Sequence, residues 1–293
     1  FAGINDLSRS HFETQDSMEL GQTLNQQRNF RSGFLNRLAN VLDGSGRSRP
    51  ISFTDQLPLV FRGDSQVPNL ALKNVGKPGV DARQAQIITA MYRDTPLART
   101  VSEGFGVRDE VIRSLSIEMD QASRNAISAK GFELEARRIA LLMREKFNLG
   151  FIDVGGWDTH VAQGGATGYL ATRLEELGRG LAAFAQAMGP DWRDTTVVVV
   201  SEFGRTFREN GNRGTDHGHG SVFWVLGGSV KGGRVVGEQV PLDAAHLFQN
   251  RDYPVMNEYR SLLGGLMARQ FSLSTNQMDQ VFPGVLAQDY GLL

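Results

Sequence analysis

The stretch from residue 151 to residue 200 constrains the fold most, because it has the pattern of a strand, a helix and a second strand. Phe151–Val154 is predicted to be a short strand closed by Gly155-Gly156. Apolar residues then recur at steps of four and three, which predicts a long helix with one buried face; they are Leu170, Leu174, Leu177, Leu181, Phe184 and Met188. Gly189-Pro190 ends this helix, and the β-branched run Thr195–Val200 is typical of a strand buried on both faces of a parallel sheet. Together these elements predict a βαβ unit and hence an α/β fold.

Further elements are expected on both sides of this unit. Val222–Leu226 predicts a third strand, and Tyr259–Met267 predicts a closing helix. In the first half, apolar residues on one face predict a helix that ends at Gly44-Ser45-Gly46. Its apolar residues are Phe30, Phe34, Leu35, Leu38 and Val41.

Prolines and glycines in residues 51–80 favour loops or edge strands, which could form a small cap. The helical pattern returns in residues 81–148, where Ile112, Leu115, Ile117 and Met119 define one helix. We predict one domain over residues 1–293. In it, residues 20–148 are mainly helical with cap-like loops, and residues 149–293 carry the βαβ part and the site.

The composition excludes several classes of protein and of site. The chain has no cysteine, which removes disulfides, thiolate metal sites and a cysteine nucleophile. Its 31 basic residues nearly balance 32 acidic ones, so no strong field attracts nucleic acid. No apolar run approaches the roughly 18 residues of a membrane span, and none is predicted.

Polar clusters follow both strands of the predicted unit. Residues 155–160 follow the first strand and residues 201–205 follow the second. Because ligands bind at the carboxyl ends of strands in open α/β sheets, both loops are expected at one edge of the sheet. A third cluster, residues 214–220, holds an aspartate and two histidines among glycines that let the backbone turn tightly.

Three of the five histidines lie in these clusters close to an aspartate, and imidazole with carboxylate is a typical ligand set of a transition ion. We predict a divalent metal ion, with zinc favoured and manganese or calcium as alternatives. The predicted ligands are Asp158, His160, Glu202, Asp216, His217 and His219. Such an ion lowers the pKa of bound water and neutralises charge on a phosphoryl or sulfuryl oxygen. Arg205, at the same edge, is predicted to clamp that oxyanion.

The same residues also have structural interpretations. Asp158 and Asp216 fit turn or N-cap positions, and Glu202 could simply pair with Arg205. The chain has no phosphate-binding loop, dinucleotide motif or Gly-x-Ser-x-Gly elbow. Nucleotide binding and serine hydrolysis therefore lose their usual support.

The two histidines outside the clusters carry weaker signals. Ser10 and Glu13 predict a capping box beside His11, which explains that stretch without chemistry. His246 has apolar neighbours and is predicted to be structural.

Three motifs together resemble a known family: residues 155–160 with Gln163, residues 201–206, and residues 210–220. Arg9-Ser10-His11-Phe12 and Tyr259-Arg260 extend the resemblance over most of the chain. The sequence is similar to DUF1501, a bacterial domain of unknown function grouped with the alkaline phosphatase and sulfatase superfamily. Its members commonly carry twin-arginine export signals.

This resemblance implies an alkaline-phosphatase-like fold, a three-layer α/β/α sandwich with a mostly parallel sheet and a helical, irregular cap in the first half. It implies a metal site at the carboxyl edge and a periplasmic or secreted location. It also brings His11 close to the site, as a catalytic candidate beside Arg205. In the wider superfamily the strand leading to Glu202 ends in Asp-His, so Phe203 stands where a histidine ligand is expected.

Family members also carry a glycine-rich strand and loop before Arg9–Phe12, where the hydroxyl nucleophile and the first ligand aspartate belong. We expect that segment to be missing here, or to be supplied by a second chain or fragment. The function expected is a metal-dependent hydrolase of a small anionic phosphate or sulfate ester. The alternative is an inactive sulfatase-like scaffold that serves as a cell-envelope binding or assembly protein.

Overall fold

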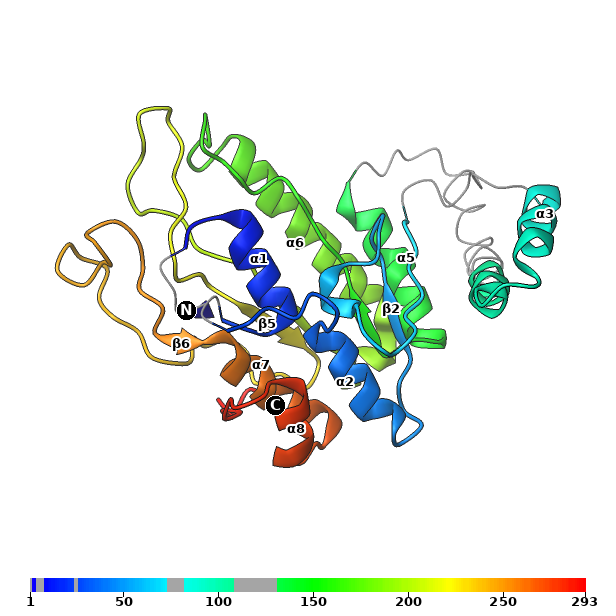
Figure 1. Ribbon diagram of the computed structural model, residues 1–293. Helices are drawn as coiled ribbons and strands as arrows, with labels where there is room; N and C mark the ends of the chain where they lie inside the picture. Colours follow the sequence, from blue (N-terminus) through cyan, green and yellow to red (C-terminus); the bar gives the residue numbers. More distant parts are fainter. Residues whose placement is uncertain (1, 4–7, 24–25, 73–81, 108–130) are drawn as a thin grey trace.

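The computed structural model of the protein describes residues 2–3, 8–23, 26–72, 82–107 and 131–293 (Figure 1). It is a mixed α/β structure with long helices and short strands. The helices are α1 (His11–Leu20), α2 (Phe34–Asp43), α3 (Ala82–Tyr92), α5 (Phe132–Glu145), α6 (Tyr169–Met188), α7 (Tyr259–Phe271) and α8 (Thr275–Val281), with 3-10 turns η1 (Leu59–Phe61) and η2 (Gly189–Asp194). The strands are β1 (Ala2–Gly3), β2 (Pro50–Ser52), β3 (Leu149–Phe151), β4 (Thr196–Val199), β5 (Trp224–Gly227) and β6 (Asn257–Glu258).

Within the described ranges, the strands form three separate pairs. β2 lies parallel to β3, and β1 lies parallel to β6. β4 lies antiparallel to β5, with Thr196 opposite Gly227. The strand expected at Thr195–Val200 is present as β4, but the parallel, fully buried arrangement predicted for it is wrong. Its partner is antiparallel, its side chains are only half-buried, and Val200 is 39% exposed. A uniformly apolar run indicates a strand, but the direction of its partner is set by the connection between them.

The central core joins distant parts of the chain. The predicted first-half helix is present as α2, and its apolar face packs with η1, α7 and α8. Tyr259 is fully buried there, and its hydroxyl donates to the carbonyl of Ser17 at 3.0 Å, which fastens α7 to α1. Phe30 lies outside α2 and is exposed, because the helix begins only after Gly33. The closing helix is confirmed as α7.

The long helix expected in the second half is confirmed as α6, which lies against α5 (Figure 1). Leu177 and Met188 are buried, whereas Leu174 is 42% exposed. The reason is length: α5 has 14 residues against 20 in α6, so it covers only part of the apolar face. None of the described helices is both long and apolar enough to cross a membrane.

Several expected boundaries differ from those observed. β3 ends at Phe151, so the residues from Ile152 to the metal-ligand cluster form a long irregular loop. Pro50–Ser52 is a fully buried strand beside β3, at the edge of the expected cap. The helix expected around Ile112–Met119 lies outside the described residues.

Two helical glycines test the packing of α7 and α6. A Cβ at Gly265 would collide with the backbone carbonyl of Gln288, whereas a Cβ at Gly178 would meet nothing within 4 Å. We expect Gly265→Ala to lower the free energy of unfolding by about 1–3 kcal/mol. Gly178→Ala should raise it by about 1 kcal/mol, because alanine favours a helix. Urea unfolding measures both, and equal effects would contradict this packing.

Candidate metal centre

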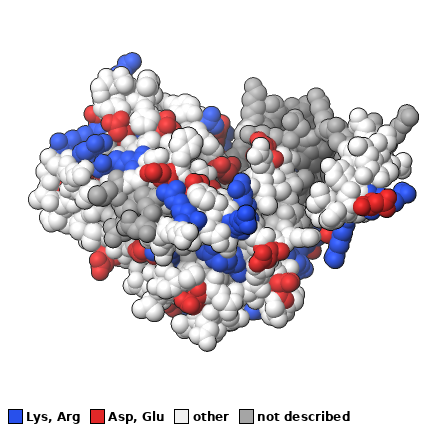
Figure 2. Space-filling model, in the orientation of Figure 1, with Lys and Arg blue, Asp and Glu red and all other residues white. Residues whose placement is uncertain are grey.

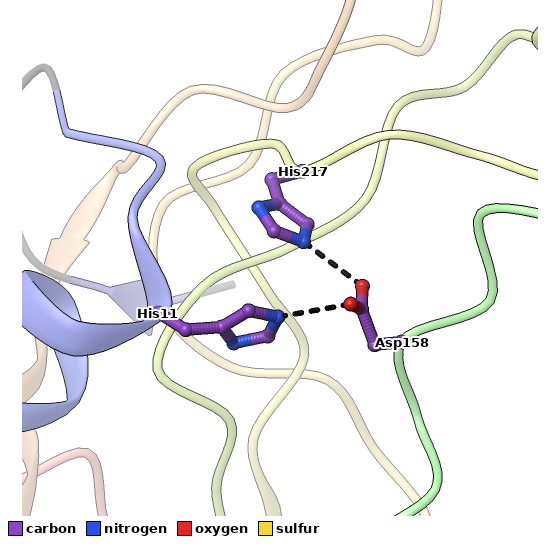
Figure 3. A group of neighbouring side chains, drawn as sticks. All are labelled: His11, Asp158 and His217. Atoms are coloured by element: carbon purple, nitrogen blue, oxygen red, sulfur yellow. Dashed lines mark hydrogen bonds and ion pairs between the residues drawn. The ribbon is translucent and has the colours of Figure 1, made fainter.

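The carboxylate of Asp158 is the meeting point of the predicted site. His160 Nε2 and His217 Nε2 each lie 2.9 Å from its Oδ1 atom and 2.9 Å from each other. Arg205 Nη1 donates to the same oxygen at 2.7 Å. His11 Nε2 approaches the second oxygen, Oδ2, at 3.4 Å, and Figure 3 shows its ring beside that of His217. The structure thus brings together residues from α1 and from all three predicted clusters.

This geometry suits the shell of a small cation. Ligand atoms of His11, Asp158 and His217 all lie within 4.8 Å of one another. His160 is equally close to Asp158 and His217 by the individual distances. In a tetrahedral zinc site, ligand atoms about 2.0–2.1 Å from the ion are roughly 3.3 Å apart. The separations of 2.9 Å among Asp158, His160 and His217, and of 3.4 Å between His11 and Asp158, are close to that spacing.

Two loops are fastened together beneath the cluster. Thr159 is buried, and both its hydroxyl and that of Thr215 donate to Gln163 Oε1 at 2.7 Å. The backbone N–H of Thr215 donates to the carbonyl of Thr159 at 3.1 Å. Gly214 permits this approach, because a side chain there would collide with the backbone of His160. Residues 158–160 and 215–217 are thereby held at a fixed spacing.

Each histidine of the cluster also has a partner on its second ring nitrogen. Such partners fix the ring orientation and leave Nε2 directed toward the cluster. The pairs are His11 Nδ1 with Glu202 Oε1 at 2.6 Å, His160 Nδ1 with Asp216 Oδ1 at 3.2 Å, and His217 Nδ1 with the carbonyl of Arg9 at 2.8 Å. Glu202 and Asp216, predicted as ligands, thus lie behind the imidazoles.

Local interactions keep both aspartates ionised. Burial alone would raise the pKa of Asp158, but hydrogen bonds from His217 and Arg205 and nearby positive charge outweigh it and lower the pKa well below the usual range. Hydrogen bonds from Asn210 and then from His160 lower the pKa of Asp216. At neutral pH the cluster therefore holds carboxylates next to imidazole nitrogens.

Each of the three guanidinium nitrogens of Arg205 donates a hydrogen bond within the protein. Its Nε donates to the hydroxyl of Thr215 at 3.0 Å, its Nη2 donates to the carbonyl of Thr215, and its Nη1 donates to Asp158. The guanidinium therefore braces Asp158. Phe203, where a histidine ligand was expected, is buried and packs on His217 with ring centroids 4.3 Å apart.

His219 lies apart from this cluster. Its Nδ1 is 2.6 Å from Asp252 Oδ2, and Asp252 also accepts from the backbone N–H of His219 at 2.8 Å. Arg9 Nη2 approaches the other oxygen of Asp252 at 3.3 Å. The side chains of His219 and Asp252 are both buried, and His219 Nε2 has no hydrogen-bond partner. Sequence reasoning missed Asp252, which has no histidine near it in the chain.

Two predictions concern the histidines outside the three clusters, His11 and His246. Ser10 is the N-cap of α1, but its side chain makes no capping bond, and Glu13 instead accepts from the hydroxyl of Ser8 at 2.7 Å. The capping box is therefore wrong. His246 is 44% exposed and pairs with Asp243 at 2.7 Å, away from the cluster.

Buried and exposed Asp-His pairs offer a matched test. Asp252→Asn removes the buried charge that faces His219 and Arg9, and we expect a loss of about 2–4 kcal/mol in the free energy of unfolding. Asp243→Asn disrupts the exposed pair with His246, and we expect a change within about 0.5 kcal/mol. Chemical denaturation compares the two. Equal losses would show that burial of the Asp252 pair has no energetic consequence.

Comparison with known proteins gives one match. A family model described as Protein of unknown function (DUF1501) matches residues 2–282, as the three motifs led us to expect. No curated protein and no solved structure matches the chain, and nothing in these comparisons supports the wider grouping with alkaline phosphatases and sulfatases. Since the match covers nearly the whole chain, the protein belongs to the DUF1501 family.

Proposed function

We propose that this protein is a metal-dependent hydrolase of a phosphate or sulfate ester. One observation carries the proposal: two imidazole nitrogens and one carboxylate oxygen lie 2.9 Å from one another. Two neutral imidazoles cannot both direct lone pairs at that spacing without a proton or cation between them. A cation, with zinc favoured, satisfies all three groups at once.

The ligands in this proposal are Asp158, His160 and His217, with His11 completing the set from α1. This gives His11 a role as a ligand, where the sequence favoured a catalytic one. Glu202 lies behind the imidazole of His11, and Asp216 lies behind that of His160. In this proposal their carboxylates orient the two rings. His219 is not included, because its nearest partner is Asp252.

A bound divalent ion would polarise an ester oxygen and lower the pKa of a bound water. The chain's own groups would support that chemistry by holding the ligands rigidly. Asp158 stays anionic beside Arg205, so it is prepared to bind a cation at neutral pH. Because all three guanidinium nitrogens of Arg205 already donate to protein groups, we assign it the positioning of Asp158 in place of the oxyanion clamp expected earlier.

We further propose that the strand pairs belong to an alkaline-phosphatase-like α/β/α sandwich with a mostly parallel sheet. The order of elements supports this fold: β3 leads into the loop that carries Asp158, and β4 leads into the loop that carries Glu202. A periplasmic or secreted location is proposed on the resemblance alone. A small anionic ester is the proposed substrate.

A second candidate function is an inactive scaffold in the cell envelope. Two observations favour it: each guanidinium nitrogen of Arg205 already donates to a protein group, and Phe203 replaces an expected ligand. This scaffold would hold the same side chains together without turnover.

Metal content and turnover separate the two candidates. We expect the purified protein to hold about one zinc ion per chain and to cleave aryl phosphates or aryl sulfates. His217→Ala should lose the ion and the activity, because it removes the imidazole closest to both Asp158 and His160. His246→Ala is the control and should keep both. Elemental analysis of each variant is the measurement, and full metal content in His217→Ala would overturn the ligand assignment.

The outer carboxylates give a finer test. Glu202→Gln keeps the shape of the side chain that orients His11 but removes its charge. We expect zinc affinity to fall by about 10–100-fold. Glu209→Gln, an exposed residue in the same connection, should leave the affinity unchanged. Competition with a chromogenic chelator measures both, and unchanged affinity in Glu202→Gln would remove Glu202 from the site.

A further inference from the structure

A cleft of about 780 Å³ opens beside the candidate metal centre. Its walls come from α1, the loop before η1, the segment after β3, and helices α5 and α6. Phe12 and Trp157 line it, and they directly follow His11 and precede Asp158 in the chain. The volume lies in the range of small-molecule sites. An organic group attached to an ester at the metal centre would therefore enter this cleft.

The walls of the cleft carry more acidic than basic groups. Its carboxylates are Asp16, Glu19, Asp55, Glu135, Asp153 and Glu176, against the two guanidiniums of Arg62 and Arg173. Glu176 pairs with Arg173 at 2.7 Å, and Asp16 pairs with Arg28 at 3.8 Å. Among the residues that the structure describes, Asp55, Glu135 and Asp153 form no ion pair. On the face drawn in Figure 2, acidic and basic side chains are interspersed.

The carboxylates act on one another across the cleft. Burial raises the pKa of Glu19, and repulsion from Asp153 and Asp16 adds to it, against hydrogen bonds from Gln15 and from the N–H of Val60. Asp153 follows β3 whereas Glu19 lies on α1, so two walls contribute to the same negative potential. A clustered negative potential of this kind raises the local concentration of cations.

Aromatic side chains stand at the end of the cleft nearest the metal centre. Phe12 is 84% exposed, which leaves its ring free to contact a ligand. The indole N–H of Trp157 donates to the carbonyl of Val154 at 2.5 Å, which fixes the second ring. Aromatic faces attract organic cations, and quaternary ammonium groups most visibly. The rings and the carboxylates therefore favour the same kind of ligand.

We propose that this acidic cleft binds the ammonium group of an amino-alcohol ester whose phosphate or sulfate group is held at the metal centre. The position of the anionic group rests on the proposed function, whereas the binding of the ammonium group rests on the cleft alone. The substrate is thus zwitterionic: its anion meets the cation site and its cation meets the carboxylates and aromatic rings. A neutral alcohol of the same shape gains only apolar contact.

Choline and its neutral isostere 3,3-dimethylbutan-1-ol provide the matched probes. Calorimetric titration of the full chain should show choline binding about tenfold more tightly than the alcohol. Asp153→Asn and Asp55→Asn, both at exposed positions of the cleft, should each weaken choline binding about fivefold. Asp243→Asn, outside the cleft, should leave it unchanged. Equal binding of the two probes, or no effect of either cleft variant, would overturn the proposal.

The same titration on His217→Ala distinguishes this inference from the proposed function. His217→Ala should still bind choline, because the substitution leaves the cleft intact. Choline binding by an unsubstituted protein that holds no metal and cleaves no ester would support the cleft and overturn the hydrolase. Turnover of aryl esters in a protein that does not prefer choline to the alcohol would support the hydrolase and overturn the cleft.

Discussion

A single carboxylate oxygen that faces two imidazole nitrogens and one guanidinium organises the structure around it. Asp158 Oδ1 lies within 2.9 Å of His160, His217 and Arg205, so loops from three parts of the chain must converge there. The contacts beneath the cluster hold these loops together. Gln163 bonds to both loops, and Gly214 lets their backbones touch. Without these contacts, nothing in the two loops would hold the imidazole nitrogens of His160 and His217 so close together.

The groups behind the imidazoles give the cluster its rigidity. Each ring has an acceptor on Nδ1, and two of the three acceptors are carboxylates, from Glu202 and Asp216. The third is the carbonyl of Arg9, whose side chain reaches Asp252 under His219. An oriented ring loses little freedom when it binds an ion. The acidic cleft beside the cluster extends toward α6, and the proposed amino-alcohol ester would place its ammonium group there.

The sequence predicted the parts of this structure that local pattern controls. The period of apolar residues identified α2 and α6, and the polar clusters around the strands identified the loops that carry Asp158 and His217. It predicted a strand at Val222–Leu226, where β5 lies, but not its antiparallel pairing with β4, because an apolar run indicates a strand and not the direction of its partner. Pairings such as His11 with Glu202, 191 positions apart, and Asp252 with His219 depend on the assembled fold. For the same reason the individual roles of Glu202 and Asp216 were not accessible from spacing.

The most direct test of the central claim is X-ray absorption at the zinc edge on the full chain loaded with one equivalent of zinc. The account predicts a first shell of about four nitrogen and oxygen atoms at about 2.0–2.1 Å, with outer-shell scattering typical of imidazole that diminishes in His217→Ala. A spectrum of hydrated zinc with no imidazole contribution would contradict this prediction, because the imidazole nitrogens around Asp158 would then not be ligands of the ion.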